Sequence, residues 1–425
     1  MNTAHPSQPE EAILVATHFG HEQDNLAHIE EFCELVSSAG IYGKHLLKVH
    51  RSKPEPRYLI GAGKAAELRE RAQANDISLT IVDRDLSRSQ IRNLEQYSGT
   101  RVISYAGLIL DIFAQRARSY EGKLQVELAQ LEYLSTHLVR GWTHLERQKG
   151  GIGLRGPGEK QLETDRRLLR RRVATIKNEL QSIKHRYQQR RRTRRKNALP
   201  SVALVGYTNT GKSTLFSALT TAQVDSANML FVTLDPITRR LELEDCTLLV
   251  SDTVGFIRNL PHQLIEAFNA TLSEVRDANL ILCVEDASDA KRLEKRRCVE
   301  QVLQQIGAGD IKCIRVMNKI DLLDNAKAKV DFNADASVRM IYLSALKGVG
   351  INLLRQALHD EIVANRRTYS FHLPASAGAL RAELYDNKRV VKDRYIPGHG
   401  WLLELSLEQI ELQKLRTRAM LHKTD

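Results

Sequence analysis

Short apolar runs alternate with helical patterns over residues 12 to 118, and this alternation predicts the first domain. Apolar runs of about four to eight residues are typical of strands, whereas apolar positions three or four residues apart indicate helices. Strands and helices in alternation predict a small, largely parallel α/β domain, which we place at residues 1–119. The expected strands are EAILVATHF, YGKHLLKVH, RYLIG, ISLTIVD and RVISY, and the expected helices are AAELRERAQ and SRSQIRNLEQY.

From about Glu121 the apolar positions lie alternately four and three residues apart. This spacing predicts two helices of roughly 35 to 40 Å, at about 1.5 Å per residue. A glycine-rich segment separates them, so we expect an antiparallel helical hairpin over residues 120–197 with its tip at ERQKGGIGLRGPGEK, residues 146–160. The first stripe holds Leu124, Leu128, Leu131, Ser135, Leu138, Trp142 and Leu145, apolar except at Ser135, and the second holds Leu169, Val173, Ile176, Leu180, Ile183 and Tyr187.

A linker at residues 197–200 precedes a second alternation of strands and helices, which predicts an α/β domain at residues 198–365. The remainder, residues 366–425, predicts a small α+β domain with a tight turn at residues 397–400. The expected strands of the larger domain are SVALVG, RRLELE, TLLVSD, NLILCVED, IKCIRVMN and RMIYLS.

Charge and cysteine content limit the classes of protein that fit this chain. It carries 63 Lys and Arg against 51 Asp and Glu, a net charge of +12, which favours polyanionic partners. The five cysteines are scattered and never in C-x-x-C spacing, so a reduced cytosol fits better than a disulfide framework or a zinc site. The chain shows neither a signal peptide nor a membrane-spanning run. We therefore expect a cytoplasmic protein, monomeric and without a membrane partner.

The second helix of the predicted hairpin is strongly basic. Residues 166–196 hold 14 Lys or Arg, and Glu179 is the only acid among them. A solvated helix face is the simpler interpretation, but these charges surround the helix and would repel one another without a polyanion. We therefore predict contact with nucleic acid or with the ribosome. The residues expected to make it are Lys149, Arg155, Lys160, Arg166, Arg170, Arg190 and Arg191.

A phosphate-binding motif, G-x-x-x-x-G-K-S, lies between a predicted strand and a predicted helix. Its glycines let backbone N–H groups surround phosphates, Lys212 is expected to reach the β- and γ-phosphates, and Ser213 to bind Mg²⁺. An accidental glycine turn is the alternative, but the strand and the helix lie where the motif requires them. Asn209 either hydrogen-bonds within the loop or helps to bind K⁺. The expected nucleotide-binding residues here are Gly206, Tyr207, Thr208, Asn209, Thr210, Gly211, Lys212, Ser213 and Thr214.

Three further motifs predict that the nucleotide is GTP. The Asp321 carboxylate can accept hydrogen bonds from the N1–H and 2-amino groups of guanine, which adenine cannot offer, so we expect strong discrimination. Asp252 is expected to hold the Mg²⁺ shell through water, and the Gly255 N–H to contact the γ-phosphate. Thr233 is the candidate switch threonine that binds Mg²⁺, although an ordinary loop threonine is the alternative. The expected nucleotide-binding residues are Phe231, Val232, Thr233, Leu234 and Asp235; Asp252, Thr253, Val254 and Gly255; Asn318, Lys319, Ile320 and Asp321; and Ser344, Ala345 and Leu346.

Catalysis is assigned to Lys212, Thr233 and Gly255. The residue that follows Gly255 is Phe256, where many GTPases carry a glutamine that orients the attacking water. A phenyl ring cannot orient water through a hydrogen bond. We therefore expect slow intrinsic hydrolysis, with the missing elements supplied by a partner, a cation or the backbone.

Together GYTNTGKST, FVTLDP, DTVGFIRNLP and NKID resemble the HflX family of translation-associated GTPases. The likeness extends upstream through LILDIFAQRARSYEGKLQVELAQLEYL and WTHLERQKGGIGLRGPGEKQLETDRR. This resemblance implies a GTPase that binds the large ribosomal subunit and helps to split stalled or idle ribosomes, with the glycine-rich tip near the peptidyl-transferase centre.

The chain departs from the family pattern in two places. The family usually has V-x-D-R-T where this chain has Val102-Ile103-Ser104-Tyr105-Ala106, so the acidic-basic pair of the family pattern is absent here. Thr210 replaces the usual alanine and is expected to point away from phosphate. The family also suggests a second nucleotide site at residues 61–64, but Gly61-Ala62-Gly63-Lys64 lacks the full spacing, and a strand-to-helix turn explains it.

Three functions remain open at this point. The leading hypothesis is a ribosome-activated GTPase that remodels or dissociates ribosomes. The second is a GTP-switched factor that occupies the large subunit during assembly or hibernation without separating subunits. The third, a GTPase chaperone for a metalloenzyme, is disfavoured by the lack of clustered His and Cys and by the density of arginine.

Overall fold

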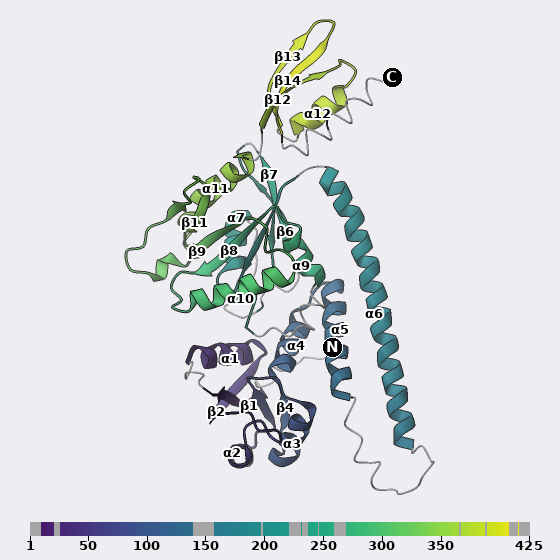
Figure 1. Ribbon diagram of the computed structural model, residues 1–425, viewed down its shortest axis with the longest axis vertical. Coiled ribbons are helices and arrows are strands. Elements are labelled where there is room, and N and C mark those ends of the chain that lie inside the picture. Colours follow the sequence, from purple (N-terminus) through teal and green to yellow (C-terminus); the bar gives the residue numbers. More distant parts are fainter. Residues whose placement is uncertain are drawn as a thin grey trace, which may run out of the picture. The chain divides into compact units, whose positions relative to one another are not determined.

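The structure is a computed structural model (Figure 1). It describes residues 10–20, 26–138, 157–196, 199–220, 231, 237–244, 246–258, 269–364, 367–386, 389–407 and 415. The chain divides by its contacts into two compact units. The first comprises Met1–Arg186, Ala227–Asp235 and Ile257–Ala270, and the second comprises Tyr187–Ser226, Pro236–Phe256 and Thr271–Asp425.

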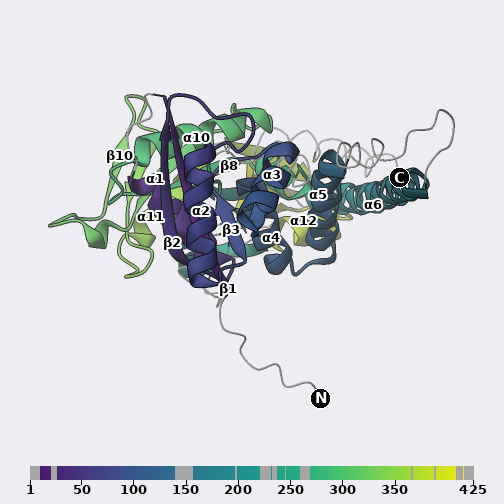
Figure 2. The ribbon, with the colours of Figure 1, turned by 90° about the horizontal axis from the view of Figure 1, so that it is seen from below.

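Four parallel strands form the sheet of the N-terminal unit, in the order β2-β1-β3-β4. Right-handed crossovers place α1 on one face and α2 and α3 on the other, because the chain reverses direction across the sheet after β2. Figure 2 shows α2 in front of this sheet, where its Leu68 packs with Ile13 and Val15 of β1. The elements are β1 Glu10–Phe19, α1 Leu26–Ser38, β2 Ile41–Arg51, α2 Ala62–Asn75, β3 Leu79–Val82, α3 Arg88–Ser98, β4 Arg101–Ile103 and α4 Tyr105–Arg116.

The expected strand RYLIG at residues 57–61 is wrong, because these residues form a tight turn. Glu55 and Leu59 exchange backbone hydrogen bonds of 3.0 and 2.9 Å, and Leu59 adopts a left-handed backbone with φ 65°. The Glu55 carboxylate also accepts from the backbone N–H groups of Arg57 and Tyr58, at 3.2 and 3.0 Å. These local bonds replace the ladder that a strand would need.

Two long helices follow, α5 at Tyr120–Leu138 and α6 at Pro157–Lys196. Leu124, Leu128, Ile176 and Ile183 form a buried cluster between them, so the predicted stripes meet as an antiparallel hairpin. Arg172 adds a two-bond ion pair with Glu127, at 2.7 and 2.8 Å. The tip was predicted over residues 146–160, but α6 already begins at Pro157, a residue suited to the first turn of a helix. Residues 139–156 lie outside the described part of the chain.

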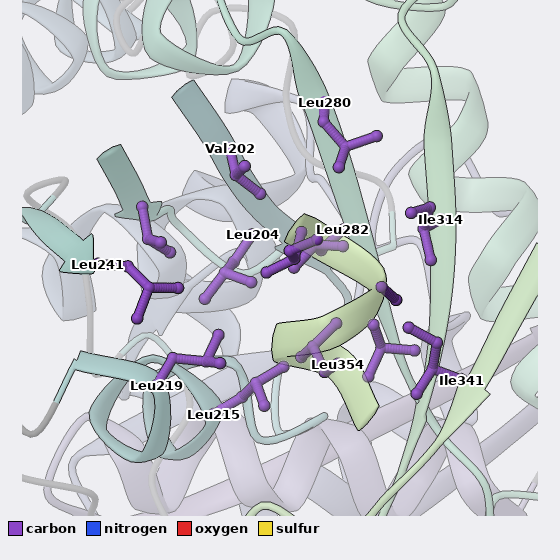
Figure 3. Close-up of a cluster of buried hydrophobic side chains, with 14 of the residues drawn as sticks. Val202, Leu204, Leu215, Leu219, Leu241, Leu280, Leu282, Ile314, Ile341 and Leu354 are labelled. Atoms are coloured by element: carbon purple, nitrogen blue, oxygen red, sulfur yellow. The ribbon is translucent and has the colours of Figure 1, made fainter. Parts of the chain in front are cut away.

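A seven-stranded sheet forms the core of the larger α/β domain, in the order β10-β11-β9-β8-β5-β7-β6. Its five central strands are parallel, and both edge strands are antiparallel. Figure 3 shows Leu215 and Leu219 of α7 and Leu354 of α11 among strand residues in one buried cluster. The sequence prediction missed β10. The elements are β5 Ser201–Gly206, α7 Lys212–Thr220, β6 Ile237–Glu242, β7 Thr247–Asp252, α9 Asn269–Arg276, β8 Leu280–Asp286, α10 Arg292–Gln305, β9 Cys313–Asn318, η2 Ile320–Leu322, β10 Lys329–Phe332, β11 Val338–Tyr342 and α11 Ile351–Ala364.

The C-terminal residues form the expected small α+β domain. A three-stranded antiparallel sheet, in the order β12-β14-β13, packs Leu403 and Leu405 against Leu380 and Leu384 of its helix. No helix in the described ranges is long and apolar enough to cross a membrane. The elements are β12 Arg367–Leu373, α12 Gly378–Asp386, β13 Val390–Ile396 and β14 Gly400–Leu407.

Candidate nucleotide-binding site

The predicted motifs meet at one edge of the seven-stranded sheet. β5 ends at Gly206, β7 at Asp252, β8 at Asp286 and β9 at Asn318. These strands are neighbours and parallel, so their carboxyl ends lie side by side. Ligands of open α/β sheets bind outside such ends, which makes this edge the candidate site.

The phosphate-binding loop wraps around the Lys212 ammonium. Nζ donates to the backbone carbonyls of Gly206 at 3.1 Å and Tyr207 at 2.6 Å. Burial lowers the pKa of Lys212 from 10.5 to about 8, while nearby Asp252 raises it. A buried cation at the start of a helix attracts phosphate, whose negative charge would offset the cost of burial. Thr210 is buried, and its hydroxyl donates to the Tyr207 carbonyl at 3.0 Å within the loop.

Asn318 joins two of the motifs to the phosphate-binding loop. Its Nδ2 donates to the Thr210 carbonyl at 2.9 Å, and its Oδ1 accepts from the Ala345 N–H at 2.9 Å. The loop approaches so closely that a Cβ at Gly211, where φ is 87°, would lie 2.3 Å from Asn318 Nδ2. Glycine is therefore required at this position.

The proposed base-reading residues follow β9 directly. The backbone of Lys319 is left-handed, with φ 62°, and its ammonium pairs with Asp286 at 2.8 Å. Asp321 lies on η2, where its Oδ1 is buried with no hydrogen-bond partner among the described residues. A buried carboxylate oxygen that lacks a donor fits a guanine edge, which presents two N–H donors. Ser344 and Ala345 are buried beside this segment, whereas Leu346 is 79% exposed.

A hydroxyl and a carboxylate lie together where the metal is expected. Ser213 Oγ donates to Asp252 Oδ2 at 2.7 Å. Both are hard oxygen donors of the kind that Mg²⁺ selects, so these residues fit the ion. Thr253 beside them is buried, and its hydroxyl donates to the Leu204 carbonyl at 2.6 Å.

The segment after Asp252 pairs with the phosphate-binding loop. Phe256 N–H donates to the Gly206 carbonyl at 3.1 Å, and the Thr208 N–H donates to the Phe256 carbonyl at 2.8 Å. The Phe256 side chain is 2% exposed. Its ring is therefore a core residue, while its backbone continues the sheet next to the nucleotide site.

The structure describes only part of the predicted segment Phe231 to Asp235. Val232, Thr233, Leu234 and Asp235 lie outside the described residues. Phe231 belongs by its contacts to the N-terminal unit, where its ring meets Phe113 of α4 edge-on, with centroids 4.7 Å apart.

The expected RNA-binding residues are described unevenly. Lys149 and Arg155 lie outside the described residues. Lys160, Arg190 and Arg191 lie on α6, but only their helical backbone is described. Arg166 is half-buried and Arg170 is exposed.

Two contacts at the site were missed by sequence reasoning. Asp286 pairs with Lys319, and its place at the end of a strand next to β5 was the only signal for it. Lys295 of α10 lies over the Tyr207 ring, 5.1 Å from its centroid, and also pairs with Asp289 at 2.6 Å. No local motif marks Lys295.

A phosphate-binding loop, an Asp-x-x-Gly segment and an Asn-Lys-x-Asp motif at adjacent strand ends define a P-loop GTPase. Three family models match consecutive parts of the chain: GTP-binding GTPase N-terminal over residues 26–114, GTP-binding GTPase Middle Region over 116–194, and 50S ribosome-binding GTPase over 201–319. The GTPase HflX of Escherichia coli strain K12 is 48% identical over 385 residues, which cover 90% of each chain. The chain therefore belongs to the HflX family of GTPases.

A second relative agrees with this assignment. The GTPase HflX of Lacrimispora saccharolytica is 41% identical over 399 residues, covering 91% of this chain and 94% of that protein. A solved GTP-binding protein from Sulfolobus solfataricus, in complex with GDP, is 23% identical and covers 83% of this chain and 98% of that chain. Its TM-score of 0.44 is too low to add to the assignment.

Proposed function

We propose that this GTPase binds the large ribosomal subunit through the hairpin of α5 and α6, which we call the arm. It uses GTP to remodel or split stalled or idle ribosomes. The observation that carries the proposal is the charge of α6. Its apolar stripe packs on α5, while Arg167, Arg170 and Arg171 are exposed and form no ion pair with any residue that the structure describes. Such a surface is suited to the phosphates of RNA.

The GTP site acts through its own residues. Lys212 and the loop N–H groups bind the phosphates, Asp321 reads guanine, and the Gly255 N–H contacts the γ-phosphate. Ser213 would ligate Mg²⁺, with Asp252 in its water shell and Thr233 closing over it. When bound, the ion neutralises charge that develops on the phosphates.

Potassium is a further proposed cofactor, held in part by Asn209. This side chain is exposed, its backbone is left-handed with φ 58°, and its amide makes no hydrogen bond to any described residue. The expectation that it bonds within the loop therefore gains no support. Turnover should be faster in KCl than in NaCl at equal ionic strength, and Asn209→Ala should remove the difference. Equal wild-type rates in the two salts would rule out K⁺.

The tip loop is proposed to contact ribosomal RNA, because its glycines give a narrow backbone and Lys149 and Arg155 supply charge. Replacing residues 150–156 with a short Ser-Gly turn should leave GTP binding intact and abolish subunit splitting. Sedimentation of 70S ribosomes with the protein and GTP, or a non-hydrolysable analogue, measures the splitting. Splitting by the loop variant at the wild-type rate would show that the tip is only a connector.

The same sedimentation profile separates the two ribosomal roles. If the wild-type protein sediments with the large subunit but 70S particles persist, the assembly or hibernation role is correct and splitting is wrong. If it binds neither particle, both roles are wrong.

A further inference from the structure

Ser104 and Tyr105, at the start of α4, connect the arm to the segment that follows Gly255. We call this segment and the one around Phe231 the switch segments, because both adjoin residues expected to contact the γ-phosphate or Mg²⁺. Ser104 caps the helix, its Oγ accepting from the Gly107 N–H at 3.3 Å, and shares a hydrogen bond of 2.8 Å with the Tyr133 hydroxyl of α5. The next residue, Tyr105, donates its hydroxyl to the backbone carbonyl of Arg258 at 3.2 Å. These are two of the positions at which the chain departs from the family pattern. A hydrogen-bonded path therefore runs from α5 to the segment after Gly255.

Tyr105 is suited to act as a donor. It is 5% exposed, and burial raises its pKa well above 10, helped by the nearby Glu31, Asp85 and Asp83. The hydroxyl therefore keeps its proton throughout the physiological range. One hydrogen bond from a fixed, buried ring to a main-chain carbonyl positions that carbonyl whatever side chain position 258 carries.

Arg258 lies only two residues from Phe256, which is paired with the phosphate-binding loop. The division between the two units falls between Phe256 and Ile257, so adjacent residues are held by different units. Two residues of extended chain span at most about 7 Å. A displacement of Arg258 by more than a few ångströms must therefore pull on the two hydrogen bonds of Phe256.

The pairing of Phe256 with the phosphate-binding loop holds Gly255 close to the Lys212 ammonium. A Cβ at Gly255 would lie 3.0 Å from Lys212 Nζ and 3.1 Å from Thr208 Cα. A γ-phosphate must fit between the Lys212 ammonium and the Gly255 N–H, because both groups contact it. We call this arrangement the closed conformation. GDP lacks the γ-phosphate and needs no space between Lys212 and Gly255, so we infer that opening of the Phe256 bonds favours GTP over GDP.

The same helix also contacts Phe231, the described residue of the segment that holds the candidate switch threonine. Phe113 of α4 meets Phe231, which is 3% exposed and keeps a left-handed backbone with φ 58°. A bulky residue adopts that backbone only where its surroundings impose it. Tyr105 and Phe113 lie eight residues apart on one helix, about 12 Å along its axis. One helix therefore contacts both Arg258 and Phe231.

We propose that Ser104 and Tyr105 couple the arm to the GTP site: Tyr105 holds Arg258 in the closed conformation, and displacement of α5 on the large subunit releases it through Tyr133 and Ser104. Tyr105 is thus a positioning residue for the segment after Gly255. The ribosomal half of this proposal rests on the function proposed above, whereas the effect on nucleotide preference does not.

The first test removes the hydroxyl alone, by Tyr105→Phe. Losing one hydrogen bond of the closed conformation should tighten GTP binding about three- to tenfold and leave GDP affinity within about twofold. Amide hydrogen exchange at residues 254–258 should become faster by a similar factor. Tyr58→Phe is the matched control, since Tyr58 is also buried in the N-terminal unit but its ring contacts Tyr97. An unchanged ratio of GTP to GDP affinity, or an equal shift in the control, would overturn the proposal.

The second test is Tyr133→Phe, which cuts the path on the side of the arm and keeps the Tyr105 bond to Arg258. Nucleotide affinities should stay at wild-type values, while stimulation of hydrolysis by large subunits falls severalfold. Retained stimulation in a variant that binds subunits normally would disprove the coupling. If large subunits do not stimulate hydrolysis by the wild-type protein, the proposed function fails. The affinities of Tyr105→Phe for GTP and GDP still decide whether Tyr105 holds the closed conformation.

Discussion

Replacing Asp321 by asparagine should weaken GTP binding without lowering the thermal stability of the nucleotide-free protein. The carboxylate is expected to accept two hydrogen bonds from guanine, each worth about 1.5 to 3 kcal/mol because one partner is charged. Asparagine keeps one uncharged acceptor but loses the second hydrogen bond and the charge, which predicts GTP binding weaker by roughly 10² to 10³-fold. In exchange, the asparagine amide can donate to the 2-carbonyl of xanthine, so XTP should bind more tightly than it does to the wild-type protein.

The stability of the same variant is the second half of the prediction. Asp321 Oδ1 is buried without a hydrogen-bond partner among the described residues, and an uncharged amide costs less to bury than a carboxylate. The melting temperature of the nucleotide-free variant should therefore be no lower than that of the wild type. Affinities are measured by displacement of a fluorescent GDP by GTP and XTP, with the exposed neighbour variant Asp324→Asn as control. Wild-type affinities for both nucleotides would refute the assignment of Asp321 to the base.

Three further outcomes are expected. Phe256→Gln should melt at a lower temperature than Phe256→Leu, because it buries an amide. In single-turnover hydrolysis without ribosomes, the Phe256→Gln variant should stay slower than the ribosome-stimulated wild type. A rate as fast as that of the stimulated wild type would contradict our account. Burial lowers the pKa of Lys212 to about 8, so its charged form predominates below pH 8 and is lost above it. The affinity for GDP should therefore fall about fourfold from pH 7 to pH 8.5 in a fluorescence titration. An affinity that does not change with pH would mean that Lys212 stays charged. The same lowered pKa means that the unfolded chain binds more protons between about pH 8 and 10.5, so this residue's contribution to stability becomes less unfavourable as pH rises through that window. Glutamate at both Arg170 and Arg171 should weaken binding to large subunits and flatten its salt dependence in filter-binding assays, and an unchanged salt slope would remove these residues from the interface.

Much of the fold followed from sequence because its patterns are local. Strand runs, heptad stripes and the loop from Gly206 to Ser213 each lie within one short segment. The structure brings the distant motifs to one edge of the sheet. The RYLIG strand failed because Glu55 and Leu59 satisfy each other's backbone, which hydrophobic pattern does not reveal.

The contacts that sequence could not supply are those between distant segments. Asp286 with Lys319 and Tyr105 with Arg258 depend on how elements pack, and neither pair shares a motif. Phe256 shows the same limit. Its position after Asp-x-x-Gly predicted a missing glutamine, whereas the structure shows that its backbone pairs with the phosphate-binding loop.

The central claim is that the large ribosomal subunit controls this GTPase. The most direct measurement is the steady-state rate of GTP hydrolysis by the purified protein alone, with purified large subunits, and with small subunits as control. Our account predicts slow hydrolysis alone, strong stimulation by large subunits and little by small ones. A rate that large subunits leave unchanged, at concentrations where the protein binds them, would contradict it.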